Sequence, residues 1–206
     1  MAMSILSEKP IRAGKEMNSF YSKEELLEMQ FRKCGEDVSI SRKAVFYSPE
    51  NIEIGSHVRI DDFCFISGGK GTRIGDYVHI ASYSALYGKF GIEIGDYVNI
   101  SSRVNIYSTS DDYSGEYLAG PLVKEEYIHD IGMKIVIEDL VIIGAGSVIL
   151  PGGILREGAA VGAMSLIKSE VPSYHIYAGA PAKFLRERSR SMLKYLEDGK
   201  EGSEHD

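Results

Sequence analysis

The sequence contains no tryptophan and only two cysteines, Cys34 and Cys64. Two cysteines thirty positions apart form neither a zinc knuckle nor a disulfide framework, so we expect two reduced, buried thiols. Positive charge is in the minority, with 23 Lys and Arg residues against 30 Asp and Glu residues and a formal net charge of −7. This balance disfavours a nucleic-acid partner, because proteins bind a phosphate backbone largely through cations that release its counterions.

Several other features are missing. No apolar run is long enough to span a membrane, and the first ten residues lack the apolar core of a signal peptide. We therefore expect no membrane insertion and a cytoplasmic location. The five histidines show no paired spacing for a metal, so we expect none, and the glycine motifs of P-loops, dinucleotide folds and serine hydrolases do not occur. With 206 residues, 44% of them hydrophobic and 26% charged, the chain fits a single globular domain.

Glycine, in contrast, is plentiful with 22 residues, and it takes part in an internal repeat. Similar segments begin every 20 residues, at Ile52, Thr72 and Ile92, and each contains an Ile-Gly pair. Aliphatic residues recur at intervals of six, with two extra residues closing each 20-residue unit: Ile54, Ile60, Ile66, Ile74, Ile80, Leu86, Ile94, Ile100, Ile106, Ile137, Ile143, Ile149, Leu155, Val161 and Ile167. Helices and antiparallel sandwiches do not sustain a period of six. The pattern predicts an all-β fold, a triangular parallel β-solenoid whose aliphatic residues stack inside.

The ends of such a solenoid need caps, because each terminal coil leaves an unpaired edge. Ser22-Lys23-Glu24-Glu25 has the arrangement of a capping box and predicts a short helix from about 23 to 33. A second helix is expected after Pro181. We divide the single domain into an N-terminal cap (1–51), first coils (52–106), a projecting loop (107–134), last coils (135–180), a C-terminal helix (181–198) and a disordered tail (199–206).

The segment 107–134 breaks the rhythm of six and is long for a loop in a compact domain. It contains Asp111, Asp112 and His129. Two interpretations stay open: a functional loop, and a solvated loop or one that packs against a neighbouring subunit.

Three further motifs lie in and after the last coils: Ile143-Gly144-Ala145-Gly146-Ser147, Val161-Gly162-Ala163-Met164-Ser165 and Tyr177-Ala178-Gly179-Ala180-Pro181-Ala182-Lys183. With these motifs, the hexads and the loop, the chain resembles the hexapeptide-repeat acyltransferases from about Ile52 to Arg186. It is most similar to the galactoside and maltose O-acetyltransferase branch and its relatives in surface-polysaccharide synthesis.

The resemblance implies a left-handed parallel β-helix, a homotrimer, and acetyl-CoA as a donor bound between adjacent helices. The family's coenzyme-binding positions fall on Ala145, Ala163, Lys168, Ser169, Lys183 and Arg186. Small residues would let a pantetheine arm approach the backbone, and the basic residues could face phosphates. Corner packing for the small residues and a solvated face for the basic ones remain open alternatives.

The sequence departs from the family at the catalytic base. The resemblance places the family's loop histidine on Asp111, so either Asp112 raises the pKa of Asp111, or another group acts, or the acceptor needs little help. His79 is the favoured substitute, because the repeat register points it outward in one column with Arg59 and Asn99; packing against a neighbouring subunit is its alternative role. The family's acceptor-lining asparagine falls on Tyr83, and we expect Tyr83, Asn99 and Asp112 to bind the acceptor. His129, in the loop, is a weaker candidate for the base.

The expected function is acetyl-CoA-dependent O-acetylation of a sugar hydroxyl in a bacterial surface polysaccharide, its precursor or a small glycoside. One alternative is N-acetylation of a nucleotide-linked amino sugar, since a neutral amine is already nucleophilic and loss of the loop histidine would matter less. The other is a non-catalytic β-helix scaffold that has lost its base.

Overall fold

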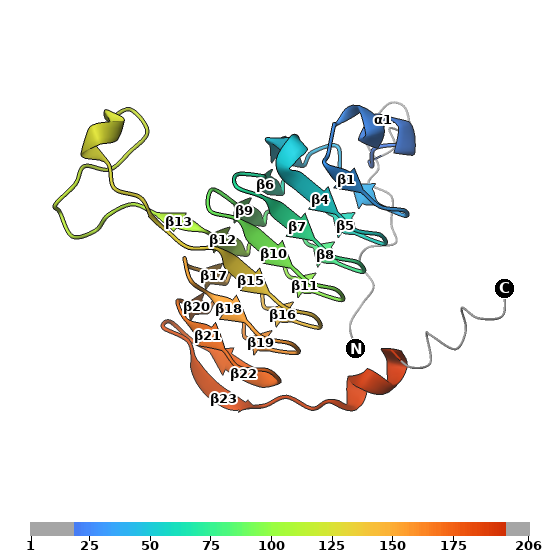
Figure 1. Cartoon of the computed structure of the whole chain (residues 1–206). Helices are drawn as coiled ribbons and strands as arrows, with labels where there is room; N and C mark the ends of the chain where they lie inside the picture. The colour runs from blue at the N-terminus through green and yellow to red at the C-terminus, as the bar shows by residue number, and fades with distance from the viewer. Residues whose placement is uncertain (1–18, 197–206) are drawn as a thin grey trace, which may run out of the picture.

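A computed structural model describes residues 19–196, which wind into a coil of short strands with three sides (Figure 1). Each side is a sheet whose strands come from successive turns of the coil and pair in parallel. The predicted solenoid is therefore confirmed, and it has about seven turns.

The three sheets are defined by their strands. The first sheet contains β1 (Lys33–Cys34), β4 (Ile52–Ile54), β7 (Thr72–Ile74), β10 (Ile92–Ile94), β15 (Ile135–Ile137), β18 (Ile154–Leu155) and β21 (Glu170–Val171). The second sheet contains β2 (Ser39–Ile40), β5 (Arg59–Ile60), β8 (His79–Ile80), β11 (Asn99–Ile100), β16 (Ile142–Ile143), β19 (Ala160–Val161), β22 (His175–Ala178) and β23 (Lys183–Glu187). The third sheet contains β3 (Val45–Tyr47), β6 (Phe65–Ser67), β9 (Ala85–Tyr87), β12 (Asn105–Tyr107), β17 (Val148–Ile149) and β20 (Leu166–Ile167).

Other elements are small. β13 (Thr109–Ser110) and β14 (Ile131–Gly132) pair antiparallel at the base of a loop that projects from the solenoid between β12 and β15 (Figure 1). Among residues 19–196, the helical pieces are α1 (Lys23–Glu28), η2 (Pro49–Asn51), η3 (Glu125–Tyr127) and η4 (Ser191–Leu193), and residues 194–196 continue η4 as α-helix.

The predicted hexad positions fill the interior. All of them are at most 3% exposed, and Ile60, Ile80 and Ile100 are fully buried. These three residues are direct partners in adjacent strands of the second sheet, so their side chains stack at about the 4.8 Å spacing of paired strands. The residue next to each of them in its strand faces outward, and equivalent residues of successive turns form outward-facing columns.

The N-terminal segment differs from the prediction in two respects. The capping box is present, with reciprocal hydrogen bonds between Ser22 and Glu25, but the helix ends at Glu28 rather than near residue 33. Gln30 has a φ of 58°, which no right-handed helix accommodates. The coils then begin at Lys33, within the segment expected to be only a cap, because β1, β2 and β3 pair with β4, β5 and β6.

The predicted C-terminal helix (181–198) is wrong over its first part, residues 181–190. Lys183–Glu187 instead forms β23, which runs antiparallel to β22 at the end of the second sheet. A helix there would leave the backbone groups of β22 unpaired, whereas a strand satisfies them. The Arg188 guanidinium then holds the chain in place by donating to the carbonyls of Leu140 at 2.8 Å and Gly158 at 2.9 Å. Helical structure starts only at η4, and the predicted tail (199–206) lies outside the described residues.

A close contact between turns explains the repeated Ile-Gly-Asp motif. A Cβ atom at Gly75 would lie 2.3 Å from Oδ1 of Asp96 and 2.7 Å from the carbonyl carbon of Gly95. That same Asp96 oxygen accepts a 2.7 Å hydrogen bond from the N–H of Asp76, one turn earlier. Glycine thus leaves room for the carboxylate that satisfies the turn of the neighbouring coil.

We predict that Gly75→Ala lowers the free energy of unfolding by about 1–3 kcal/mol, because the added methyl group meets backbone atoms that have little room to move. Urea denaturation measures the change. Arg73→Ala, an exposed position in β7 just before Gly75, is the control and is expected to shift stability by less than about 0.5 kcal/mol. Equal losses in the two variants would contradict this account of the glycine.

Candidate active site

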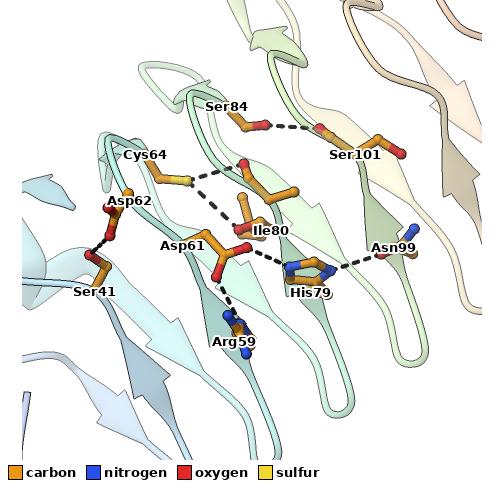
Figure 2. A network of polar contacts seen from close by, with 11 residues as sticks. Ser41, Arg59, Asp61, Asp62, Cys64, His79, Ile80, Ser84, Asn99 and Ser101 are labelled. Atoms are coloured by element: carbon orange, nitrogen blue, oxygen red, sulfur yellow. Dashed lines mark hydrogen bonds and ion pairs between the residues drawn. The ribbon is translucent and has the colours of Figure 1, made fainter. Parts of the chain in front are cut away.

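A polar network crosses the outer face of the second sheet, with His79 at its centre (Figure 2). Nε2 of His79 lies 2.9 Å from Oδ2 of Asp61, and Nδ1 lies 3.1 Å from Oδ1 of Asn99. Nε of Arg59 donates to Oδ1 of Asp61 at 2.8 Å. Both ring nitrogens of His79 are therefore engaged within the chain.

The repeat register builds this network. Arg59, His79 and Asn99 are direct partners in β5, β8 and β11, in the single outward column that the sequence predicts. Val78 and Ile80 on either side of His79 are buried, at 1% and 0% exposure, so the imidazole is turned outward and is half-buried.

Asp61, which sequence reasoning missed, is the anchor of the network. Its side chain is only 9% exposed. Burial alone would raise the pKa of Asp61, but hydrogen bonds from His79 and Arg59 outweigh it and hold the pKa below its ordinary value. The repeat itself carried a signal: Asp61 takes the position held by Ala81 and Ser101 in the next two turns, where a carboxylate is out of place unless it has partners.

Cys64 lies behind the network, nearer the core (Figure 2). Its thiol is buried and approaches the carbonyl oxygen of Ala81 at 3.3 Å. Burial raises the pKa of Cys64 to about 11, so the thiol is neutral and has no role as a nucleophile at physiological pH. Cys34 is half-buried, and both cysteines are free.

Tyr83 occupies the corner between the second and third sheets, in the turn that follows β8. It is 54% exposed, with a φ of 64°. Its ring stacks on Phe63 at a centroid distance of 5.0 Å, and the Arg103 guanidinium lies 5.7 Å from its centroid on the following turn. With a neighbour on each side along the column, the ring offers mainly its edge and hydroxyl to a ligand.

The loop residues lie on another side of the molecule. Asp112 accepts hydrogen bonds from the hydroxyl of Ser114 at 2.6 Å and from its N–H at 2.9 Å, and these bonds lower the pKa of Asp112. Asp111 is exposed, and His129 packs its ring 5.0 Å from that of Tyr117. Because the loop leaves the third sheet, one chain does not bring Asp111 to the network around His79.

The expected coenzyme-binding residues fall into two groups. Ala145 and Ala163 occupy adjacent exposed turns at the corner between the second and third sheets, and Lys183 opens β23 beside them, since Ala182 donates to the carbonyl of Leu166. Arg186 is exposed further along β23. Lys168 and Ser169, also exposed, lie at the next corner, between β20 and β21.

The alanine turns have the properties that a slender ligand needs. Within residues 19–196, the N–H groups of Ala145 and Ala163 have no hydrogen-bond acceptor in the protein. A Cβ at Gly144 would lie 2.4 Å from the nitrogen of Ala163, which shows how closely the two turns approach. Exposed, unpaired backbone donors beside small side chains suit the amide-rich pantetheine arm of coenzyme A.

No group of His, Cys, Asp and Glu side chains in the described part of the chain is arranged to hold a metal ion. No helix within the same residues has the length and apolar character needed to cross a membrane.

Comparison with known proteins gives two strong similarities, although no family model matches the chain. A dTDP-4-amino-4,6-dideoxy-D-glucose acyltransferase from Escherichia coli is 48% identical over 171 residues, which are 82% of this chain and 89% of that protein. The N-acyltransferase AntD from Bacillus cereus, solved with dTDP-4-amino-4,6-dideoxyglucose and coenzyme A, is 44% identical. Its TM-score is 0.87, and the match covers 90% of this chain and all of AntD.

AntD has also been solved with dTDP and 3-hydroxybutyryl-CoA, and in variants that replace one serine or one aspartate. A maltose O-acetyltransferase from Clostridium difficile is more distant, at 20% identity and a TM-score of 0.54 over 82% of this chain and 75% of that one. This last similarity extends to the fold alone.

The lowered pKa of Asp61 predicts a pH-dependent contribution to stability. A carboxylate with a depressed folded-state pKa stabilises the fold above its ordinary pKa of 3.8, and this contribution is lost as the pH falls through the folded-state value. Asp61→Asn should therefore be less stable than the unsubstituted protein at pH 7, and the difference should shrink below about pH 4. Thermal melts from pH 3 to 7 test this, with the exposed Glu50→Gln as control. A difference that stays constant across the range would contradict the assignment.

Proposed function

The chain belongs to the hexapeptide-repeat sugar N-acyltransferases, and on this basis we propose that it transfers an acyl group from coenzyme A to the amino group of dTDP-4-amino-4,6-dideoxyglucose or a close relative. The observation that carries the proposal is the 48% identity to an acyltransferase of that sugar nucleotide over 82% of the chain. The expected enzyme class and the coenzyme A thioester donor are confirmed by the same relatives. They favour the N-acylating alternative over transfer to a sugar hydroxyl.

The chemistry of an amine acceptor fits the missing loop histidine. The neutral amine attacks the thioester carbonyl, a C–N bond forms, the C–S bond breaks, and the proton lost by nitrogen ends on the departing thiolate. A neutral amine needs no prior deprotonation to attack, whereas a hydroxyl does. For the same reason, a non-catalytic scaffold is not needed to explain the absence of the histidine.

Of the two predicted bases, we favour Asp111 as the group that receives a hydrogen bond or proton from the attacking amine. In the described part of the chain its carboxylate has no protein partner, whereas both ring nitrogens of His79 are engaged. The replaced serine and aspartate in AntD are ten positions apart. In this sequence only Ser101 with Asp111 and Ser102 with Asp112 have that order and spacing, which supports a role for the base of the loop.

The donor site follows from the exposed turns and cations described above. We propose acetyl-CoA as donor, with its pantetheine arm along Ala145 and Ala163 and its phosphates facing Lys183 and Arg186. Lys168 and Ser169 lie at the next corner, between β20 and β21. We propose that they contact the coenzyme on the side opposite the alanine turns. Acyl-CoA and sugar nucleotides are cytoplasmic metabolites, so the proposal places the enzyme in the cytoplasm.

A homotrimer would unite the candidate residues that one chain holds apart. The outer face of the third sheet carries no charged residue on its described strands; it consists mainly of Val45, Tyr47, Phe65, Ala85, Tyr87, Tyr107, Val148 and Leu166. The outer face of the first sheet carries Lys33, Glu53, Arg73, Glu93 and Glu170. We propose that copies meet through the third sheet, which brings the loop of one copy toward the second sheet of the next.

Thiol release from acetyl-CoA tests the acceptor. We expect turnover with dTDP-4-amino-4,6-dideoxyglucose and none with dTDP-6-deoxyglucose, which has a hydroxyl in place of the amine, because the amine is the stronger nucleophile. Maltose and a galactoside are the controls for the O-acetyltransferase branch. Turnover with the hydroxyl sugars alone would overturn the proposal, and absence of any stabilisation by coenzyme A in thermal shifts would favour the scaffold.

Tyr87→Glu tests the interface. Its ring packs between Phe65 at 4.9 Å and Tyr107 at 4.7 Å on the third sheet, so a buried charge there should convert trimers to monomers. Light scattering after gel filtration measures the mass, and circular dichroism verifies that the coil is intact. Arg73→Glu, on the charged first sheet, should leave the mass unchanged; a trimer that survives Tyr87→Glu would exclude this face.

A further inference from the structure

We propose that Asp61 and His79 are positioning residues that orient the side-chain amide of Asn99, so that its NH₂ group faces outward as a hydrogen-bond donor to the thioester carbonyl oxygen of the acyl donor. His79 would then act as a double donor rather than as a base. The proposal rests on the proposed acyl transfer and assigns a source for the charge stabilisation that this transfer requires.

The first argument is the chemistry of the two contacts of His79. Its partners are a carboxylate oxygen of Asp61 at 2.9 Å and the amide oxygen of Asn99 at 3.1 Å, and both are acceptors. With an acceptor facing each ring nitrogen, the arrangement fits a ring that donates from both nitrogens, which is the role the proposal assigns to His79. A general base needs a nitrogen with a free lone pair, which this geometry does not offer.

The second argument is electrostatic. The charged groups that face His79 are Arg59 from β5 and Asp61 from the turn that follows β5. β11 offers the neutral Asn99, and the inward neighbours are the apolar Val78 and Ile80. Oδ2 of Asp61 contacts the imidazolium while Oδ1 is held by Arg59. A buried, ionised carboxylate stabilises a cation beside it, so the proton on His79 has a built-in counter-ion.

The third argument concerns the free end of the network. Because Oδ1 of Asn99 accepts from His79, its Nδ2 points away from the ring (Figure 2). Within the described residues Nδ2 donates to no protein atom, and Asn99 is half-buried at the surface of the second sheet. The network therefore fixes the side-chain NH₂ group of Asn99 on the outer face of the second sheet, where it is available to a ligand.

The fourth argument is the place of Asn99 along the proposed donor track. Ala163 and Ala145 lie in successive turns at the corner between the second and third sheets, and Asn99 pairs with Ile142, three residues before Ala145. The turn that follows Asn99 reaches the same corner, where the carbonyl of Ser102 accepts the N–H of Gly146. A pantetheine arm that runs over the two alanine turns from β23 thus ends near the turn of Asn99, where the thioester would lie.

Asn99→Asp, which keeps the size of the side chain but removes its outward donor, tests the role directly. We expect kcat to fall at least 100-fold with a change in KM of no more than a few-fold, because the donor acts where charge develops in the transition state. Asn51→Asp makes the same exchange near the N-terminus and should leave kcat unchanged. If Asn99→Asp instead raises KM alone, Asn99 contributes only to binding and the proposal fails.

The pH dependence separates a positioning imidazolium from a base. The amino sugar itself titrates, so the informative quantity is the ratio of kcat between the unsubstituted enzyme and His79→Gln at each pH. A positioning imidazolium gives a ratio that is largest at low pH and falls as the ring loses its proton. A general base gives a ratio that rises with pH, and that result would overturn the proposal.

Nitrogen NMR distinguishes a doubly protonated His79 ring from a general base without any measurement of turnover. In protein labelled with ¹⁵N-histidine, the signals that disappear in His79→Gln should show two protonated ring nitrogens at neutral pH, and Asp61→Asn should shift them toward the neutral ring. A ring with one unprotonated nitrogen at neutral pH would refute the inference even if the acceptor assay succeeds. Two protonated nitrogens in a protein that turns over no amino sugar would instead leave the network standing and reject the proposed function.

Discussion

Stacking of each turn in register on the one before is the constraint on which the rest of this structure depends. Parallel pairing places Ile60, Ile80 and Ile100 directly above one another, so each buried aliphatic side chain packs against those of the adjacent turns. The same geometry acts outside the core, because any residue type repeated at the same position becomes a continuous column. Functional residues in such a protein therefore lie either in these columns or at positions where one turn departs from the repeat.

The three faces use this constraint differently. Opposite charges alternate along the first sheet, as Lys33, Glu53, Arg73 and Glu93, which suits contact with solvent. Apolar and aromatic side chains stack along the third sheet, which suits contact with another copy. The second sheet alone sets a cation, an imidazole and an amide in one column, and a nearly buried carboxylate beside them converts three surface residues into one ordered network.

Periodicity accounts for what the sequence could reveal. The aliphatic columns and the outward column of Arg59, His79 and Asn99 follow from spacing alone, because a solenoid fixes neighbours by residue number. Asp61 escaped notice because it occupies a turn, where its direction depends on side-chain torsions rather than on register. The strand β23 escaped because amphipathic spacing near Leu185 fits a helix, while the unpaired edge of β22 decides the conformation and is visible only in three dimensions.

The presence of Asp111 where the O-acetyltransferases have a histidine, and the occupation of both ring nitrogens of His79, have one chemical explanation. A hydroxyl acceptor demands a base, and this chain presents no free imidazole at its network. An amine acceptor needs mainly an oriented thioester carbonyl and a place for a proton that the leaving thiolate itself can receive. The proposed site, with hydrogen-bond donors toward the thioester and the Asp111 carboxylate toward the amine, would meet that need. The departures from the O-acetyltransferase pattern therefore fit the proposed transfer to nitrogen.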